Sequence, residues 1–316
     1  MGTAQARADF SPAWAVATKE EVENTMIPTT MEGRTCLITG GTNGIGKSTA
    51  LGLAKMGATV VIVGRNTPKT AQVVEAIRAA SGNNNVDFLL ADLSSQQEVR
   101  RLADEFKRKY LHLHVLLNNA GAAFLQRQLS VDGIEMTFAL NHLAPFLLTN
   151  VLLDTLKAST PARIINVSSS AHTSGKIEFD NLQGERTYGF GAYPNAKLAN
   201  ILFTMELARC VEGSGVTVNA LHPGFTATGF GKNNGKVMAA LVSIVAPLVA
   251  RSPEKGAETS IYLASSPSVE GMTGKYFYNS HVTRVAPQAT DMVVARKLWE
   301  VSAELVHLPD GLPLQT

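Results

Sequence analysis

The stretch of this chain that most constrains its fold is Arg34-Thr35-Cys36-Leu37-Ile38-Thr39-Gly40-Gly41-Thr42-Asn43-Gly44-Ile45-Gly46-Lys47. Cys36–Thr39 is a short apolar run rich in β-forming residues, and it predicts a buried strand. The glycines lead into Lys47–Ala54, whose apolar residues have helical spacing. A strand, a glycine turn and a helix suit a dinucleotide, because glycines let the backbone approach a pyrophosphate and a helix start favours negative charge. The spacing Gly40-x-x-x-Gly44-x-Gly46 differs from the G-x-G-x-x-G fingerprint, and an ordinary glycine-rich turn would share it.

Apolar runs and helical patterns continue to alternate along the chain. The further strands expected are 58–63, 86–93, 113–117, 163–168, 216–221 and 274–278, and the further helices are 69–80, 97–110, 141–156, 197–207, 253–264 and 288–306. The strand segments are apolar without alternation, which implies that both faces of the sheet are covered, as in a parallel sheet. We therefore predict an α/β protein with a single Rossmann-type domain, in which a doubly wound parallel sheet forms the middle of three α/β/α layers and ligands bind at its carboxyl edge.

The chain is expected to divide into three parts. Residues 1–32 are polar and alanine-rich and are expected to form an N-terminal tail. Residues 33–285 are expected to form the nucleotide-binding and catalytic domain. Residues 286–316 are expected to form a helical extension that packs on the same domain.

Composition excludes several classes of function. A formal charge of +2 without a long basic run argues against nucleic acid as a partner. The two cysteines, Cys36 and Cys210, look like buried apolar residues of a protein in a reducing compartment, so a cytoplasmic location is expected. Their spacing and that of the histidines suggest no metal site. The sequence has no signal peptide that would predict export, and it has no run of about 18 apolar residues that would predict a transmembrane segment.

The end of the second expected strand favours NADP(H) over NAD(H). An acidic residue for the adenosine ribose is expected about 20 residues after the glycine turn of an NAD site. This chain has Gly64-Arg65-Asn66 there. The guanidinium of Arg65 would favour a 2′-phosphate through its charge and its bidentate geometry. The alternative is that Arg65 is only a solvated loop charge.

Four motifs occur in order along the chain: Gly40-x-x-x-Gly44-x-Gly46, Asp92-Leu93, Asn118-Asn119-Ala120-Gly121 and Tyr193-x-x-x-Lys197. From about Gly33 to its C-terminus the chain therefore resembles the short-chain dehydrogenase/reductase family. Its nearest likeness is to the retinol-dehydrogenase-like branch. That narrower resemblance rests on Ala139-Leu140-Asn141-His142-Leu143, Asn166-Val167-Ser168-Ser169-Ser170-Ala171-His172, Lys197-Leu198-Ala199-Asn200 and Leu298-Trp299-Glu300-Val301-Ser302.

The resemblance implies a set of site residues. Those implied to bind the cofactor are Gly40, Thr42, Asn43, Gly44, Ile45, Gly46, Arg65, Asn66, Asp92, Leu93, Asn119, Ala120, Gly121, Tyr193, Lys197, Pro223, Gly224, Thr226 and Thr228. Those implied to be catalytic are Asn141, Ser169, Tyr193 and Lys197.

The resemblance also implies roles for the catalytic group. Asn141 would distort its helix and hold a water in a proton relay, and Lys197 would reach the nicotinamide ribose. Ser169 would donate to a substrate carbonyl oxygen, with Ser168 and Ser170 as the alternatives. His142 and His172 carry no comparable signal and are expected to be packing or surface residues.

Tyr193 and Lys197 form the chemical pair, because residues four apart share one face of a helix. A phenol of pKa about 10 is a poor acid–base group near neutrality, and a pKa of about 7 requires about 4 kcal/mol of differential stabilisation of the phenolate. A nearby lysine ammonium, helped by an oxidised nicotinamide, is expected to supply it. Pro194 complicates the geometry, since proline is tolerated only in the first turn of a helix. Either the helix begins near Ala192 or the pair is displaced.

Two further segments bear on the substrate. Residues 176–187 are polar and are expected to form the rim of the substrate entrance. Residues 237–249 are apolar throughout but too short to span a bilayer, and they read as a buried helix, a lid over an apolar substrate or an interfacial patch. Peripheral membrane contact and homo-oligomerisation are both compatible with the sequence.

The predicted function is an NADP(H)-dependent oxidoreductase that interconverts an apolar aldehyde or ketone and its alcohol by hydride transfer, with Tyr193 as acid and base. One alternative is a non-catalytic NADP-binding or scaffold protein of the same fold. A second is a sugar-nucleotide epimerase or dehydratase, against which the short sequence after Pro223 argues. Fold alone does not decide among them.

Overall fold

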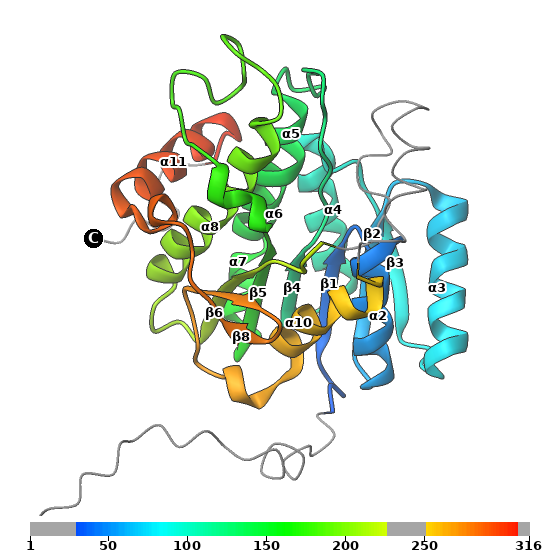
Figure 1. Ribbon diagram of the computed structural model, residues 1–316. Helices are drawn as coiled ribbons and strands as arrows, with labels where there is room; N and C mark the ends of the chain where they lie inside the picture. Colours follow the sequence, from blue (N-terminus) through cyan, green and yellow to red (C-terminus); the bar gives the residue numbers. More distant parts are fainter. Residues whose placement is uncertain (1–29, 226–250, 309–316) are drawn as a thin grey trace, which may run out of the picture.

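Eight strands form one sheet in the order β3-β2-β1-β4-β5-β6-β7-β8 (Figure 1). The computed structural model describes residues 30–225 and 251–308. The strands are β1 (Thr35–Thr39), β2 (Thr59–Gly64), β3 (Val86–Leu90), β4 (Val115–Asn118), β5 (Ala162–Val167), β6 (Val216–Leu221), β7 (Lys275–Tyr278) and β8 (His281–Val282). Strands β1 to β7 pair in parallel, which confirms the predicted sheet, whereas the short antiparallel strand β8 was not predicted.

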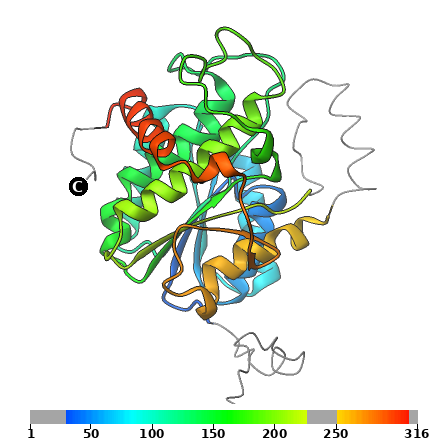
Figure 2. The same cartoon turned by 60° about the vertical axis from the view of Figure 1, so that its left-hand side comes forward.

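Helices connect the strands and cover both faces of the sheet. The α-helices are α2 (Gly44–Lys55), α3 (Thr67–Ser81), α4 (Gln96–Lys109), α5 (Met136–Phe138), α6 (Ala144–Val151), α7 (Leu153–Lys157), α8 (Ala192–Cys210), α10 (Pro253–Ser265) and α11 (Met292–Leu305). A π-helical turn, η1 (Ala139–Leu143), joins α5 to α6, and 3-10 turns are η2 (Ser170–Ser174), η3 (Pro267–Val269) and η4 (Pro287–Thr290). Helices α2, α3 and α10 lie on one face, and α4, α6 and α8 lie on the other (Figures 1 and 2).

Two apolar cores lie on opposite faces of the sheet, and strands β1 to β7 contribute to both. In β1, Leu37 packs into the core under α4, α6 and α8, whereas Cys36 and Ile38 pack into the core under α2, α3 and α10. All three side chains are fully buried. Successive side chains of a strand point to opposite faces, so a strand with both faces covered has no polar alternate positions. This explains the continuous apolar runs of the sequence.

The C-terminal segment packs against α8, as Figure 2 shows for α11. Trp299 is buried, and its ring centroid lies 4.9 Å from that of Phe146. Asp291 caps the start of α11 by accepting the N–H groups of Val293 and Val294. Helix α11 therefore begins at Met292 and not at residue 288, because Asp291 forms the cap and the preceding Pro287–Thr290 form a separate turn.

Two details of the sequence interpretation require correction. Met31 was assigned to the N-terminal tail, but it is only 4% exposed and its N–H donates to the carbonyl of Met56 at 2.7 Å. Cys210 is half-buried beside Glu206 and Arg209, so it is not the buried apolar filler that was expected. Cys36 is buried as predicted, and its burial raises the pKa of its thiol to about 12.

The strand order brings the functional candidates together. On one side of β1 the sheet continues with β2 and β3, and on the other side it continues with β4 and the later strands. The strand order therefore reverses between β1 and β4. The loops at the carboxyl ends of parallel strands separate at such a switch point and leave a crevice for ligands. Gly40, Asn119, Ser169 and His222 all follow strands that end at this edge.

Candidate functional site

The glycine turn after β1 is tight, and there is no space for a side chain at Gly40 or Gly46. Gly40 has a φ of +67°, a backbone conformation that favours glycine. A Cβ atom at Gly46 would lie 2.4 Å from the carbonyl oxygen of Gly40 and 2.5 Å from Nδ2 of Asn119. The Asn43 side chain does not cap α2, and the first turn of α2 has no acidic residue. The N–H groups at this helix start are therefore disposed to bind an anionic group.

Thr39 joins this turn to the loop after β4. Its hydroxyl accepts the N–H groups of Asn119 and Ala120 at 2.9 and 3.0 Å, and Asn119 Nδ2 donates to the Thr39 carbonyl at 2.8 Å. These bonds hold Asn119 and Ala120 against the glycine turn. The sequence interpretation missed Thr39. Its place as the last residue of the strand, directly before Gly40, is the only signal the sequence contains.

The loops after β2 and β3 carry the next candidates. Arg65 is exposed and forms an ion pair with none of the described carboxylates. Asn66 caps α3, since its Oδ1 accepts the N–H of Lys69 at 2.9 Å. The side chain of Asn66 is thus committed to the helix start, whereas Arg65 keeps its guanidinium available.

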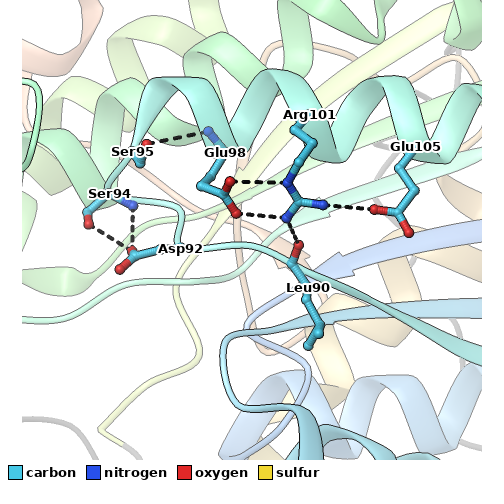
Figure 3. Close-up of polar contacts among 7 residues, drawn as sticks. All are labelled: Leu90, Asp92, Ser94, Ser95, Glu98, Arg101 and Glu105. Carbon is cyan, nitrogen blue, oxygen red and sulfur yellow. Dashed lines mark hydrogen bonds and ion pairs between the residues drawn. The ribbon is translucent and has the colours of Figure 1, made fainter.

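Asp92 lies in a turn that the start of α4 organises (Figure 3). Its carboxylate accepts the N–H and the hydroxyl of Ser94 at 3.0 and 2.7 Å. Ser95 caps α4, and Arg101 contacts Glu98, Glu105 and the carbonyl of Leu90 at the end of β3. Leu93 is buried. The end of β3 and the Asp92 turn are therefore held together by the first turns of one helix.

Asn141 lies in the π-helical turn and is fully buried. Its Nδ2 donates to the carbonyls of Ala122 and Thr137 at 2.7 and 2.8 Å, whereas its Oδ1 accepts no hydrogen bond from the part of the chain that the structure describes. Pro145 has no N–H, so the regular helical bond to the carbonyl of Asn141 cannot form. This gives a physical cause for the distorted helix, and the sequence interpretation missed it.

Gly121 brings Asn141 and Lys197 to the same place. A Cβ atom at Gly121 would lie 2.5 Å from Asn141 Oδ1 and 3.3 Å from Lys197 Nζ. Both polar atoms therefore contact the backbone of the loop after β4. Glycine at this position allows that approach.

Ser169, Tyr193 and Lys197 meet where β5 ends and α8 begins. The Ser169 side chain forms a hydrogen bond with Tyr193. Ser168 is buried and donates to the Lys197 carbonyl at 2.7 Å, and Ser170 is exposed. Lys197 Nζ donates to the Val167 carbonyl at 3.0 Å and lies 5.5 Å from the centroid of the Tyr193 ring. Of the three serines, only Ser169 faces the phenol.

The helix start resolves the question that Pro194 raised. Helix α8 begins at Ala192, so Pro194 is its third residue. The first four N–H groups of a helix have no partner within the helix, so a proline at this position removes no helical hydrogen bond. Tyr193 and Lys197 keep the spacing of one helical turn.

Burial shifts the pKa values of both members of the pair in the protein without a bound nucleotide. Burial raises the pKa of Tyr193 to about 12, and the hydrogen bond from Ser169 lowers it only in part. Burial also lowers the pKa of Lys197 to about 8. Without a bound nucleotide the pKa of Tyr193 therefore lies above its ordinary value, because removing the phenolate from water disfavours the charged form. The lowering expected from Lys197 together with an oxidised nicotinamide stays a prediction.

The turn after β6 carries the last candidates that the structure describes. Gly224 has a φ of +78°, and its N–H donates to Nδ1 of His222 at 3.3 Å. Pro223 and Gly224 follow β6, beside the end of β5. Thr226, Thr228 and the apolar stretch 237–249 lie outside the described residues.

A cavity of about 340 Å³ lies under the loop that precedes α8. Its lining mixes apolar side chains, such as Phe138, Leu182 and Ala192, with polar ones, such as Lys176, Asn181 and Asn195. Glu135, which the sequence interpretation missed, anchors the loop: its carboxylate lies 2.8 Å from the Tyr188 hydroxyl and accepts the N–H groups of Thr137 and Phe138. The segment predicted to form the rim of the entrance does line a cavity, and this cavity reaches the first turn of α8.

His142 is a packing residue, as expected. It is buried, and its Nε2 lies 2.9 Å from the Ser302 hydroxyl on α11. Burial lowers its pKa to about 4. Within residues 30–225 and 251–308, no group of three or more His, Cys, Asp or Glu side chains is placed to hold a metal ion. None of the helices described there is long and apolar enough to cross a bilayer.

Comparisons with known proteins agree on one family. A family model described as short chain dehydrogenase matches residues 34–238. The chain is 42% identical to human retinol dehydrogenase 11 over 282 residues, which cover 88% of this chain and 87% of that protein. It is 41% identical to human retinol dehydrogenase 13, with 93% and 91% covered.

Solved structures agree with this likeness. A crystal structure of an uncharacterised protein from Mycobacterium paratuberculosis superposes with a TM-score of 0.73 at 30% identity and covers 90% of this chain and 97% of that one. The Pseudomonas aeruginosa RhlG/NADP active-site complex superposes with a TM-score of 0.63 at 29% identity, covering 79% and 95%.

Proposed function

Because the chain belongs to the short-chain dehydrogenase family, and is thus an oxidoreductase that interconverts alcohols and carbonyls with NAD(P), we propose that it uses NADP(H) and acts on an apolar aldehyde or ketone. The observation that carries this proposal is the convergence of Ser169, Tyr193 and Lys197 at the end of β5. A hydrogen-bond donor, a phenol and a buried ammonium at one point suit the polarisation and protonation of a carbonyl oxygen.

Tyr193 supplies the proton in the proposed reduction. Its hydroxyl gives the proton to the substrate oxygen as a carbonyl becomes an alcohol, and Ser169 donates a hydrogen bond to the same oxygen. The ammonium of Lys197 stabilises the tyrosinate that remains. With a pKa of about 8, Lys197 is protonated about ten to one at pH 7. Asn141 Oδ1 and Lys197 Nζ flank Gly121, so Asn141 can orient a water that returns the proton.

The residues at the carboxyl edge fit a dinucleotide. The open N–H groups at the start of α2 and the close approach of Gly40, Gly46 and Asn119 would hold the pyrophosphate. Asp92 and Leu93 would contact the adenine, and the loops after β4 and β6 would hold the nicotinamide end. When bound, the nicotinamide gives or accepts the hydride. Residues of the chain would bind the substrate oxygen, transfer its proton and exclude water from the site.

The cavity supports a substrate of medium size, and the similar proteins support its apolar character. The cavity of about 340 Å³ beside the first turn of α8 has a mixed lining, in which apolar side chains from α5, the preceding loop and α8 lie among polar ones. Pockets of 300–1,000 Å³ are typical of sites for small organic ligands. The names of the similar proteins are those of retinol dehydrogenases. We propose retinoid-like or other extended apolar aldehydes as the substrate class.

The proposal is tested by following NADPH oxidation with a panel of medium-chain, aromatic and isoprenoid aldehydes and ketones, with NADH in parallel. Turnover with NADPH preferred over NADH supports the reaction and the cofactor together. Binding of NADPH without turnover of any member of the panel would favour the scaffold function instead.

Arg65→Ala is expected to raise the KM for NADPH about 10-fold and to leave the KM for NADH nearly unchanged. The reason is that only NADPH has a 2′-phosphate, and a charge-assisted hydrogen bond contributes about 1.5–3 kcal/mol. Steady-state kinetics with both cofactors measure the effect. The matched control is Lys55→Ala, which also removes one exposed positive charge. Lys55 lies in the last turn of α2, at the end of this helix that is remote from the glycine turn. Equal losses with both cofactors, or a wild type that prefers NADH, would contradict the assignment of Arg65.

A further inference from the structure

A buried histidine lies behind Ser169, in the turn η2. His172 is only 2% exposed, and its Nδ1 lies 2.7 Å from the carbonyl oxygen of Ser169. The backbone N–H of His172 donates to the same oxygen at 3.1 Å. A surface or packing role, which the sequence suggested for His172, does not account for a side chain that contacts the peptide of the serine beside Tyr193.

The second ring nitrogen fixes the tautomer of His172. Its Nε2 lies 3.2 Å from the backbone nitrogen of Ala286, and a backbone N–H only donates. Nε2 must therefore accept, so it carries no proton, and the proton of the neutral ring is on Nδ1. Nδ1 then donates to the carbonyl of Ser169. In a protonated ring, Nε2 would carry a second N–H directed at the backbone N–H of Ala286, which is unfavourable. Burial also lowers the pKa of His172.

Tyr276 on β7 closes the same network. It is 2% exposed, and its hydroxyl lies 3.2 Å from the carbonyl oxygen of Ser169 and 3.3 Å from Nδ1 of His172. The ring of His222 lies beside Tyr276, at 5.6 Å between centroids. These contacts leave the imidazole little freedom to turn.

We propose that His172 is a positioning residue, which orients the peptide of Ser169 so that the serine side chain faces Tyr193. The proposal rests on the proposed function, because it assigns His172 an effect on catalysis through Ser169. Ser169 is the N-cap of η2 and has extended backbone (φ −155°, ψ 154°); its Oγ accepts the N–H of Ala171 at 3.1 Å, and its carbonyl accepts the N–H of His172. The hydrogen bond from Nδ1 adds a side-chain constraint on the same carbonyl and ties Ser169 to Ala286, where the C-terminal segment begins.

Two isosteric variants separate the two hydrogen bonds of the ring. His172→Asn places an amide where Nδ1 was and can keep the bond to Ser169, and His172→Gln places one where Nε2 was and can keep the bond to Ala286. We expect His172→Asn to keep kcat within about 3-fold of wild type and His172→Gln to lower kcat about 10-fold to 100-fold, with the KM for NADPH unchanged in both. If both variants lost kcat to the same extent and in proportion to their losses of Tm, the proposal would be overturned.

A double-mutant cycle tests whether His172 acts through Ser169. In the Ser169→Ala background, His172→Gln is expected to leave kcat at the value of the single Ser169→Ala variant, since the group that His172 positions is gone. A second loss that multiplies the first would overturn the proposal.

A measurement on the wild-type protein needs neither turnover nor a folded variant. Nitrogen NMR of the histidine rings is expected to show His172 neutral with the proton on Nδ1. A proton on Nε2 would exclude donation to Ser169 and overturn the proposal. If the wild type turned over no carbonyl, the proposed function would fail, while the tautomer would still decide whether His172 can hold Ser169.

Discussion

Replacing Tyr193 with phenylalanine is expected to lower kcat for carbonyl reduction about 1,000-fold while NADPH still binds. The phenol forms a hydrogen bond with the Ser169 side chain, and a positioned acid contributes roughly 10²–10⁴-fold to rate. Phenylalanine keeps the ring, which packs near Lys197 Nζ, so the helix start should be preserved. Single-turnover consumption of NADPH measures the chemical step, and fluorescence of bound NADPH measures the affinity.

The control for this substitution is Tyr262→Phe. Tyr262 lies on α10, on the other face of the sheet, and also loses only a hydroxyl. It is expected to keep kcat near the wild-type value. A Tyr193→Phe protein with kcat within 10-fold of wild type would show that another group, or water, supplies the proton.

Replacing Lys197 with methionine is expected to abolish turnover and, at the same time, to stabilise the protein at pH 7 by about 1–3 kcal/mol. Lys197 is 3% exposed, its Nζ donates to the carbonyl of Val167, and it forms an ion pair with none of the described carboxylates. Burial lowers the pKa of Lys197 to about 8 from 10.5, and each pKa unit corresponds to about 1.4 kcal/mol. Methionine removes the buried charge and keeps the length of the side chain, at the cost of the hydrogen bond to Val167.

The pH dependence of this gain has a definite sign. Between pH 8 and 10.5 the unfolded chain holds a proton on Lys197 that the folded protein has released, so the stability contributed by this group rises with pH across that range. The cost of the buried lysine is complete below pH 8 and absent above 10.5. Urea unfolding of both proteins should therefore show an advantage of Lys197→Met at pH 7 that shrinks toward pH 10. Lys55→Met, at an exposed position, should show no such trend, and a Lys197→Met protein less stable than wild type at pH 7 would refute the expectation.

The parts of the fold and site that could be predicted are those encoded in local sequence pattern. Continuous apolar runs identified the parallel strands because both faces of the sheet are covered, and glycine positions identified the turn after β1 because no Cβ fits there. Tyr193 and Lys197 were paired by their spacing and by the resemblance to the family. These features need only a short window of the chain.

The parts that could not be predicted depend on contacts between distant segments. Thr39 contacts Asn119, 80 residues later in the chain, and Glu135 contacts Tyr188, 53 residues later. His172 contacts Ala286, 114 residues later. The pKa of Tyr193 in the protein without a nucleotide could not be predicted for a related reason, since the extent of its burial depends on how the whole edge packs. The π-helical turn at Asn141 was implied by family resemblance, but its cause at Pro145 was overlooked.

The two edges of the sheet bear on how copies of this protein can associate. At one edge, the carbonyls of Val86 and Leu90 on β3 accept the side chains of Arg78 and Arg101 and are not open to a strand of another molecule. At the other edge, β8 is only two residues long and pairs antiparallel with β7. Short or covered edge strands discourage intermolecular β-pairing and the aggregation that follows from it. We therefore expect no continuous intermolecular sheet to form through the edge strands that the structure describes.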